Sequence, residues 1–532
     1  MADRVGRPAF LSRRDVVRAG VFTGAALALP LQRWASGQSS TSRRIGEAKL
    51  PAPYSVPFVR PPVSTPVRVA DGVEYHRIVM APLQTEVLPG YRTTLYAYNG
   101  SVPGPTIRAT RGTPIVARFI NRLPLMHATL KYEPYTSVHL HGGASLPQYD
   151  GYASDITRPG QYKDYRWENK ERSRTLWYHD HGFHHTAQNV YMGLAAQYHL
   201  LDPNDAALGL PTGDYDVPLV ITDAMFERSG ELLFSLENEK GLWGDVVLVN
   251  GRPWPVMRVA RRKYRFRVLN GCVSRSFHWF LDNGADVTVI GTDAGLMPSP
   301  VRTRRIRHTN GERYDVVIDF AAYPAGTRIA MRNASLKYND DYTHTDKIMM
   351  FEVVDDAFDP SNNSVPDVLA PDNPVMTTPV SRSVRTRNFR TERQGGEWTV
   401  NGNTWQDVID SGFRFTEARP VHGTTEIWEY QNNSGGWAHP MHAHLIDVRI
   451  LSRNGRPPYP YEVGPKDTIN VGENEVVRVL ATFDGCGKYM IHCHNTMHED
   501  HDMMTQFEVV DPAHAAPDPF SAPAVPLPEL PL

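Results

Sequence analysis

Short runs of alternating apolar and polar residues recur along most of the chain and predict β-strands. Examples are TPIVARFIN (113–121), YRFRVLN (264–270), RYDVVIDF (313–320) and EVVRVLATF (475–483). Gly, Pro, Asn and Asp separate the runs, as is typical of antiparallel β-sandwiches. No long segment shows sustained helical periodicity. The pattern therefore predicts an all-β protein.

The chain also repeats itself. GTPIVARFIN (112–121) and GTTEIWEYQN (423–432) share a Gly-Thr start and an Asn nine positions after the Gly, and RRKYRFRVLN (261–270) has the same length and terminal Asn. FEVVD occurs at 351–355 and again at 507–511. Such internal similarity indicates that one structural unit is used several times.

Length and repeats together predict three related β-domains, since 532 residues correspond to roughly three units of about 150 residues. We place them at 46–210, 211–356 and 386–512. Residues 357–385 are rich in Pro, Asp and Ser and predict a linker. The Pro- and Ala-rich tail, 513–532, is expected to be loosely packed.

The N-terminus predicts an export signal over residues 1–38. Arg13 and Arg14 precede an apolar stretch, Ala19 to Leu31, that is shorter than the ~20 residues a membrane span requires. This resembles a twin-arginine (Tat) signal, although a plain basic tail is the alternative. A Tat signal implies the Tat translocase as a partner and export of the folded protein. It also implies a periplasmic, cell-surface or extracellular location in a bacterium.

Charge and cysteine content restrict the partners and crosslinks. The formal net charge is only −2, which gives no electrostatic case for a nucleic-acid or membrane-surface partner, and no stable membrane insertion is expected. The three cysteines, Cys272, Cys486 and Cys493, do not make a disulfide framework. Whether Cys272 and Cys486 pair with each other is left open.

Four His-x-His pairs carry the candidate chemistry. Residues i and i+2 of a strand share a face, so each pair presents two imidazoles side by side. Imidazole suits copper, zinc, iron and nickel, which leaves the metal open. The pairs fall only in the first and third predicted domains, so we expect the metal between those two. The eight histidines are His139, His141, His179, His181, His442, His444, His492 and His494.

Cys493 narrows the choice of metal. It lies between His492 and His494, so its sulfur points to the opposite face and serves a different ion. A set of two histidines, a cysteine and a weak axial methionine is that of a blue copper electron-transfer site. Candidates to complete the set are His439, His498 and Met503.

These motifs resemble those of the three-domain multicopper oxidases. The similarity extends over nearly the whole chain after the export signal and is greatest to the bilirubin oxidase and bacterial spore-coat laccase group. It rests on HCHNTMHEDHDMM (492–504), WYHDH (177–181), KYRFRVLN (263–270) and ERYDVVIDF (312–320). The resemblance implies three cupredoxin-like Greek-key β-sandwich domains and four copper ions.

The resemblance also implies a role for each ligand. The type 1 copper ligands would be His439, Cys493, His498 and Met503; the type 2 ligands, His139 and His442; and the type 3 ligands, His141, His179, His181, His444, His492 and His494. The family usually exposes the histidine that matches His498, so we expect electrons to enter there. Trp437 matches the bilirubin oxidase pattern and is predicted to lie in the substrate pocket.

Two carboxylates, Asp150 and Glu499, match acids that relay protons in this group. Reducing O2 to water takes four electrons and four protons, and copper supplies only electrons. The alternative is that each acid is solvated or merely orients a ligand histidine. The implied reaction is one-electron oxidation of phenols, aromatic amines or bilirubin-like tetrapyrroles coupled to reduction of O2.

Three other functions are alternatives. One is an o-aminophenol coupling oxidase similar to the phenoxazinone synthases. Another is an oxidase of Mn(II) or Cu(I), which would need acidic or methionine sites near His498 that the sequence does not show. The third, a non-enzymatic protein of the same fold, is disfavoured because such relatives have lost the copper ligands. Fold and ligands do not fix the natural substrate.

Overall fold

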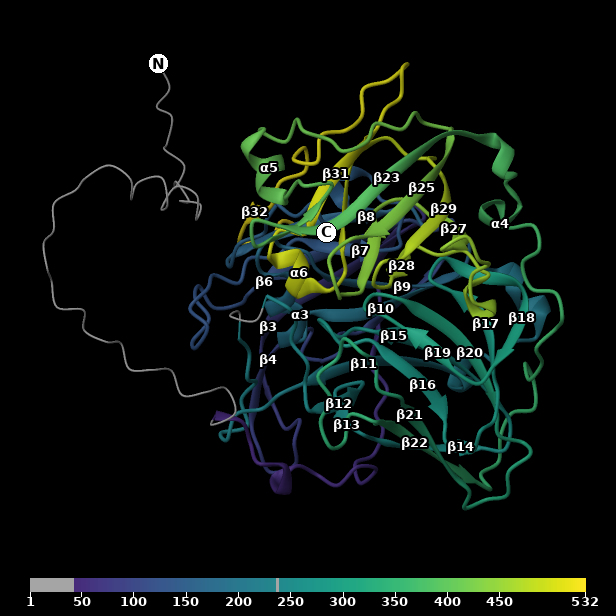
Figure 1. Ribbon diagram of the computed structural model, residues 1–532. Coiled ribbons are helices and arrows are strands. Elements are labelled where there is room, and N and C mark those ends of the chain that lie inside the picture. The colour runs from purple at the N-terminus through teal and green to yellow at the C-terminus, as the bar shows by residue number, and fades with distance from the viewer. Residues whose placement is uncertain (1–42, 236–238) are drawn as a thin grey trace, which may run out of the picture. The chain divides into compact units, whose positions relative to one another are not determined.

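The structure is a computed structural model that describes residues 43–532 except 236–238 (Figure 1). The predicted export signal lies outside the described residues. One compact unit spans Arg44–Leu532. Its regular structure is mostly β-strand, which confirms the all-β prediction. Six sheets form three face-to-face pairs.

The first pair joins a five-stranded and a six-stranded sheet. The five-stranded sheet has the order β1 (Val63–Ser64), β5 (Thr106–Thr110), β10 (Ala195–Leu201), β9 (Arg174–Asp180) and β7 (Val138–His141). The other has the order β2 (Arg68–Ala70), β3 (Val73–Thr85), β6 (Ile115–Asn121), β8 (Gln161–Trp167) and β32 (Val525–Pro526), with β4 (Thr93–Tyr98) beside β3. Buried residues of both sheets, including Ile78, Phe119 and Tyr178, form one core.

The second pair joins a seven-stranded and a five-stranded sheet. The larger has the order β13 (Arg252–Pro253), β12 (Val246–Val249), β11 (Asp216–Ala224), β15 (Lys263–Asn270), β20 (Arg313–Asp319), β17 (Val287–Thr292) and β18 (Gly295–Thr303). The smaller has the order β14 (Val256–Ala260), β22 (Lys347–Val354), β21 (Arg328–Asn333), β16 (Phe277–Leu281) and β19 (Ile306–His308). Phe266, Phe320 and Phe351 meet between them.

The third pair joins a five-stranded and a four-stranded sheet. The first has the order β24 (Glu397–Val400), β23 (Ser383–Gln394), β25 (Thr425–Asn432), β29 (Val476–Thr482) and β27 (Val448–Arg453). The second has the order β28 (Thr468–Val471), β26 (His439–Ala443), β30 (Gly487–Cys493) and β31 (Met504–Val509). Cys493 is fully buried in the core between them.

The sequence repeats occupy equivalent strands of the three pairs. Strands β6, β15 and β25 each run parallel to one neighbour and antiparallel to the next. All three repeats end in Asn, and the three Asn side chains form the same kind of hydrogen bonds. The side-chain oxygens of Asn121, Asn270 and Asn432 accept the backbone N–H two residues on. Their amide nitrogens donate to carbonyls of following loops. We propose that the three sheet pairs are the three predicted domains.

Helices are few and short. They are α3 (Thr186–Met192), α4 (Pro374–Thr377), α5 (Trp405–Asp410) and α6 (Thr496–Asp500). Single 3-10 turns occur at Glu47–Lys49, Pro147–Tyr149, Pro203–Leu208, Gly213–Tyr215, Val380–Arg382 and Pro460–Glu462. Helices α3 and α6 lie side by side (Figure 1). The Asp500 carboxylate of α6 accepts the N–H groups of Thr186 and Ala187 at the start of α3. This contact joins the first and third sandwiches next to the histidines.

The linker and the tail are both held by specific contacts. In the linker, the carbonyls of Ser361 and Asn362 accept hydrogen bonds from the Arg262 guanidinium at 2.9 and 2.8 Å. The tail was expected to be loosely packed, and this expectation is wrong. Strand β32 pairs with β8, and Glu529 forms an ion pair with Arg77. The proline-rich composition prevents a long strand but not docking against another sheet.

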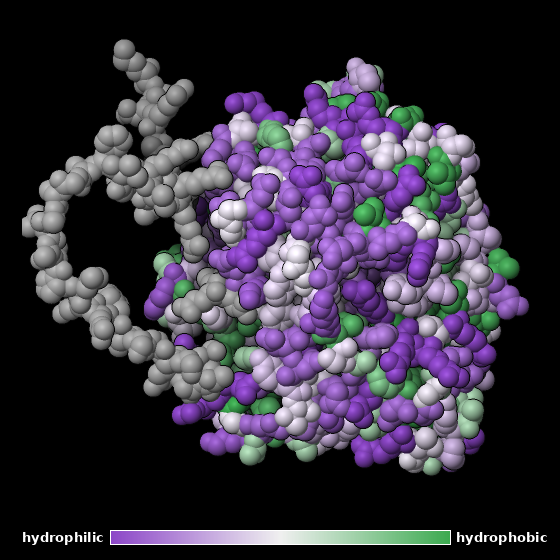
Figure 2. All heavy atoms as spheres, viewed as in Figure 1, coloured by the Kyte–Doolittle hydropathy of each residue, from purple (hydrophilic) through white to green (hydrophobic). Residues whose placement is uncertain are grey.

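The described surface is mixed in character. Figure 2 shows one face on which hydrophobic residues are scattered among hydrophilic ones rather than gathered into a large patch. Among the described residues, no helix is both long enough and apolar enough to cross a membrane. All three thiols are free, so the possible Cys272–Cys486 disulfide is absent from the structure.

Candidate metal centre

His439, Cys493 and His498 meet in one buried cluster. Strand β26 supplies His439, the end of β30 supplies Cys493, and α6 brings His498 back to the same point. The Cys493 Sγ atom lies 3.4 Å from His439 Nδ1 and 3.6 Å from His498 Nδ1. Met503 is also fully buried, and its carbonyl accepts the Cys493 N–H at 3.1 Å. The sequence predicted these residues as a group but did not predict the helix α6.

The outer nitrogens of this cluster are fixed by acceptors. His498 Nε2 donates to the carbonyl of Lys240 at 3.0 Å, and His439 Nε2 donates to Ser434 Oγ at 2.8 Å. Each ring therefore carries its proton on Nε2 and turns the lone pair of Nδ1 toward the sulfur. The Ser434 hydroxyl in turn donates to Asn432 Oδ1 at 2.6 Å. Asn432 thereby positions His439, a role that the sequence did not reveal.

His498 lies in the expected cluster, but its side chain is covered. Its exposed fraction is 0%, so the expectation of an exposed histidine is wrong. The Lys240 carbonyl lies against the ring edge, and the Trp398 ring packs beside the imidazole with the two ring centroids 4.3 Å apart and tilted by 30°. Trp437 is half-buried, with its ring 6.3 Å from that of His498.

The eight histidines of the four pairs lie together between the first and third sandwiches, where rings from one contact rings from the other, and all are buried. Their strands place the pairs opposite each other. His139 is the register partner of His179 on β7 and β9, and His442 is the partner of His492 on β26 and β30. Because every pair ends its strand, the second histidine can turn into the gap between the sandwiches.

Two groups of three histidines surround separate points. In the first group, His492 Nε2 lies 3.1 Å from His181 Nε2 and 3.2 Å from His444 Nε2. In the second group, ligand-type nitrogens of His141, His179 and His494 lie within 4.8 Å of one another. The sequence predicted all six residues but did not divide them into these two groups.

Several buried nitrogens of the second group face nothing that can bond them. His179 Nδ1 donates to the Asp180 carbonyl at 2.7 Å, which leaves a lone pair on Nε2. That nitrogen and His141 Nδ1 have no hydrogen-bond partner among the described residues. Unpaired buried polar atoms are costly. A metal cation at the point where the lone pairs converge would satisfy them, so this donor set fits a metal.

His139 and His442 face each other in the same way. His139 Nδ1 donates to the Asp150 carbonyl at 2.6 Å, and His442 Nδ1 donates to the Asp467 carbonyl at 2.9 Å. Both Nε2 atoms therefore carry lone pairs, yet they lie only 3.5 Å apart. Two lone pairs repel each other at this distance unless a cation or a proton lies between them.

Burial favours the neutral form of His181 and His498. It lowers the pKa of His181 to about 3 and the pKa of His498 to about 3. Neutral imidazole is the form that binds a metal. Burial also raises the pKa of the Cys493 thiol. A metal ion binds the thiolate form, so binding of a metal at Cys493 would release the thiol proton.

Asp150 contacts two of the rings. Its Oδ2 atom accepts from His444 Nδ1 at 2.7 Å, while Oδ1 lies 3.5 Å from His139 Nδ1 and has no hydrogen-bond partner among the described residues. The carboxylate is buried, and burial raises its pKa. It is therefore an acid that holds a ligand ring with one oxygen and keeps the other oxygen available.

Glu499 lies between two rings of the first group. Its Oε2 atom is 3.1 Å from His492 Nδ1, and its Oε1 atom is 3.6 Å from His181 Nδ1. Burial raises its pKa, but the two imidazoles outweigh burial and lower the pKa to about 2. Both predicted acids therefore lie beside the histidine clusters, Asp150 at His444 and Glu499 at His492.

Asp467 is a residue that the sequence analysis missed. Its Oδ1 atom accepts from His141 Nε2 at 3.0 Å, and the same carboxylate forms a buried ion pair with Arg313. Burial raises its pKa, but Arg313 outweighs burial and the pKa is lowered. No motif precedes Asp467, and it reaches the site only because β28 pairs with β26.

Comparisons with known proteins identify the family of the chain. Two family models described as "Multicopper oxidase" match residues 370–513 and residues 80–205. The chain is 41% identical to bilirubin oxidase from Albifimbria verrucaria over 86% of this chain and 80% of the relative. The chain belongs to the multicopper oxidase family. It is also 34% identical to the laccase of Bacillus subtilis over 85% of this chain and 97% of the relative.

Solved structures give the same result. A laccase from Pediococcus acidilactici covers 87% of this multicopper oxidase with 95% of its own chain, at a TM-score of 0.76 and 27% identity. The predicted cupredoxin-like fold is thereby confirmed. The protein is a copper-dependent oxidoreductase that uses O2 as its acceptor.

Proposed function

We propose that this oxidase holds four copper ions, with each ligand in the role that the resemblance implies. His439, Cys493, His498 and Met503 would bind the type 1 ion, and His139 and His442 the type 2 ion. The two groups of three histidines would each bind one type 3 ion. The observation that carries the proposal is the convergence of unpartnered ring nitrogens on separate buried points.

The bound ions would supply one-electron oxidation at the type 1 site and four-electron reduction of O2 at the other three. The chain supplies the connection, because Cys493 is covalently adjacent to both His492 and His494. Asp150 and Glu499 are placed to pass protons toward the histidine clusters. Asp150 is the better suited of the two, since burial raises its pKa, whereas the pKa of Glu499 is lowered.

The proposed donors are phenols, aromatic amines or bilirubin-like tetrapyrroles, as the names of the relatives suggest. O2 uptake by the copper-loaded protein should be measured with bilirubin and o-aminophenol side by side. Faster uptake with bilirubin is expected. Faster turnover of o-aminophenol to a condensed product would contradict this choice of donor. No uptake with either these or a generic electron donor would contradict the oxidase function itself.

Export by the Tat translocase forms part of the proposal. It rests on Arg13 and Arg14 and on the apolar stretch after them. A variant with both arginines changed to lysine should stay in the cytoplasm of a bacterial host while remaining folded. Equal export of this variant and the wild type would contradict the proposal.

A further inference from the structure

A pocket adjoins the histidine–cysteine cluster where the second and third sandwiches meet. Its volume is about 430 Å³, within the range of small-molecule sites. Trp437, Ala438 and Pro440 line it and flank His439 in the sequence. Asn495 also lines it, and its amide lies 3.1 Å from His498 Nε2. A molecule in this pocket would therefore lie one side chain away from both histidines, although His498 itself is buried.

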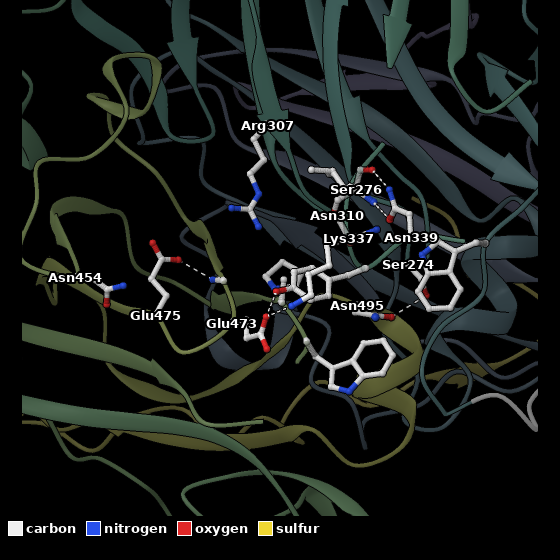
Figure 3. A pocket seen from close by; sticks show the side chains of 17 residues that line it. Ser274, Ser276, Arg307, Asn310, Lys337, Asn339, Asn454, Glu473, Glu475 and Asn495 are labelled. Atoms are coloured by element: carbon white, nitrogen blue, oxygen red, sulfur yellow. Dashed lines mark hydrogen bonds and ion pairs between the residues drawn. The ribbon is translucent and has the colours of Figure 1, made fainter. Parts of the chain in front are cut away.

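Arg307 carries an uncompensated positive charge in this pocket. It belongs to β19 and is half-buried. Figure 3 shows its guanidinium extending into the pocket without a dashed interaction. Among the described residues it forms no ion pair with a carboxylate. Its side chain contacts the neutral amide of Asn470. With that amide turned toward Arg307, the Asn470 oxygen accepts from Nε at 2.9 Å, from Nη1 at 3.2 Å and from Nη2 at 2.8 Å.

The carboxylates of the pocket are already engaged elsewhere. Glu473 forms an ion pair with Lys337 and accepts from the Tyr338 hydroxyl at 2.8 Å (Figure 3). Glu475 accepts the Gly472 N–H at 2.7 Å and lies 3.2 Å from Arg453. The negative charges thus have cationic partners of their own. Arg307 is left to attract an anion from solution.

The rest of the lining suits an aromatic ring. Trp243 and Trp437 offer indole faces, and the Trp437 ring lies 6.3 Å from the His498 ring. The Trp243 N–H is buried and has no hydrogen-bond partner among the described residues. This N–H is covered in the structure, so the aromatic side chains of the lining, and not a hydrogen bond from Trp243, favour an aromatic ligand.

We propose that this pocket binds the reducing substrate and that Arg307 selects aromatic substrates bearing a carboxylate. The inference rests on the proposed oxidase function. Each phenol loses one electron and one proton and becomes a phenoxyl radical. Four such oxidations supply the four electrons, and together with four protons these convert one O2 into two waters. Arg307 takes no part in this transfer; it holds the carboxylate through charge-assisted hydrogen bonds.

The test compares syringate with its uncharged methyl ester. In the copper-loaded Arg307→Gln protein, kcat/KM for syringate should fall roughly tenfold or more relative to kcat/KM for the ester, the usual effect of losing a charged hydrogen bond. Arg304→Gln is the matched control. It removes the same charge from an exposed residue that pairs with Asp286 and does not line the pocket. This control should leave the ratio unchanged.

A binding measurement separates recognition from turnover. Trimethoxybenzoate has the carboxylate but no phenolic hydroxyl, so it should bind without being oxidised. Calorimetry on the copper-loaded proteins should show binding to wild type and to Arg304→Gln, and much weaker binding to Arg307→Gln. Equal binding of trimethoxybenzoate to all three proteins would overturn the role of Arg307. An equal fall in kcat/KM for syringate and for its methyl ester in Arg307→Gln would overturn it as well. A wild type that oxidises neither acid nor ester would instead contradict the oxidase proposal, while calorimetry would still report on the pocket.

Discussion

At the scale of single residues, the histidines divide their two ring nitrogens between two tasks. One nitrogen donates to a fixed acceptor, such as the Asp150 carbonyl for His139 or the Lys240 carbonyl for His498. This sets the tautomer and leaves the other lone pair facing a common point. Partners of this kind orient a ligand and tune its basicity. The acceptors are therefore as important to the site as the imidazoles.

The two acids should be separable from the ligands by mutation. Asp150→Asn and Glu499→Gln are each expected to lower turnover by about 10²–10⁴-fold, the usual contribution of a proton-transfer group. Copper content of the loaded proteins should stay unchanged, because Asn or Gln still offers an oxygen to the contacted ring and neither substitution leaves a buried arginine unpaired. Turnover with saturating donor and copper per protein should be measured on the same samples. Loss of copper from the Asp150→Asn protein would assign that residue a structural role instead.

Asp467 should matter for both copper affinity and stability. Asp467→Asn weakens the hydrogen bond to His141 and leaves Arg313 buried without its carboxylate. We expect copper affinity to fall about 10–100-fold and the free energy of unfolding to fall by about 3–5 kcal/mol. Copper retained against a chelator and urea unfolding would measure these. Asp319→Asn, in an exposed ion pair with Lys263, is the control and should change neither quantity.

At the scale of elements, the position of most proposed ligands follows from where strands end. The His-x-His pairs lie at the ends of β7, β9, β26 and β30. Beyond these ends the side chains no longer alternate between the two faces of a sheet. Helix α6 then returns His498 to the sulfur of Cys493. The repeated Asn at the ends of β6, β15 and β25 closes the following loop in every sandwich, but only Asn432 reaches a proposed ligand.

The three equivalent asparagines offer an internal comparison. Asn432→Ala and Asn270→Ala each remove several buried hydrogen bonds, so each should lower the free energy of unfolding by at least about 1–3 kcal/mol. Only Asn432→Ala should also alter the blue absorption of the type 1 site, since only that residue holds Ser434 against His439. Equal spectra for both variants would show that Asn432 does not position the ligand.

At the scale of the whole described unit, the histidine clusters depend on how the first and third sandwiches are held together. Contacts between α3 and α6 and the path of the tail both join these sandwiches. In the tail, the centroid of the Phe520 ring lies 5.4 Å from that of Tyr152, in the first sandwich. It lies 4.9 Å from that of Phe413, which follows α5 in the third domain. The tail thus contacts both sides of the interface at which the histidines lie.

Removal of the tail should weaken this interface. A chain ending at residue 512 loses β32, the Phe520 ring and the Arg77–Glu529 pair. We expect a lower Tm with unchanged copper content in the folded protein, because no proposed ligand lies in the tail. Glu529→Gln alone should lower stability by at most about 1 kcal/mol, as is usual for a partly exposed ion pair. An unchanged Tm after truncation would show that the tail contacts add no stability.

The sequence by itself determined the all-β class, the family and the twelve candidate ligands. Strand alternation and His-x-His spacing involve residues that are close together in the chain, so both can be read from the sequence, and the resemblance to the family rests on such motifs. Only the tertiary structure decided which histidines share a point, why Asp467 and Asn432 belong to the site, and that His498 is covered while a neighbouring pocket is open. These depend on contacts between strands and loops far apart in the chain, such as Lys240 with His498 and Asp467 with His141. No local pattern encodes such contacts, because packing of whole sheets sets them.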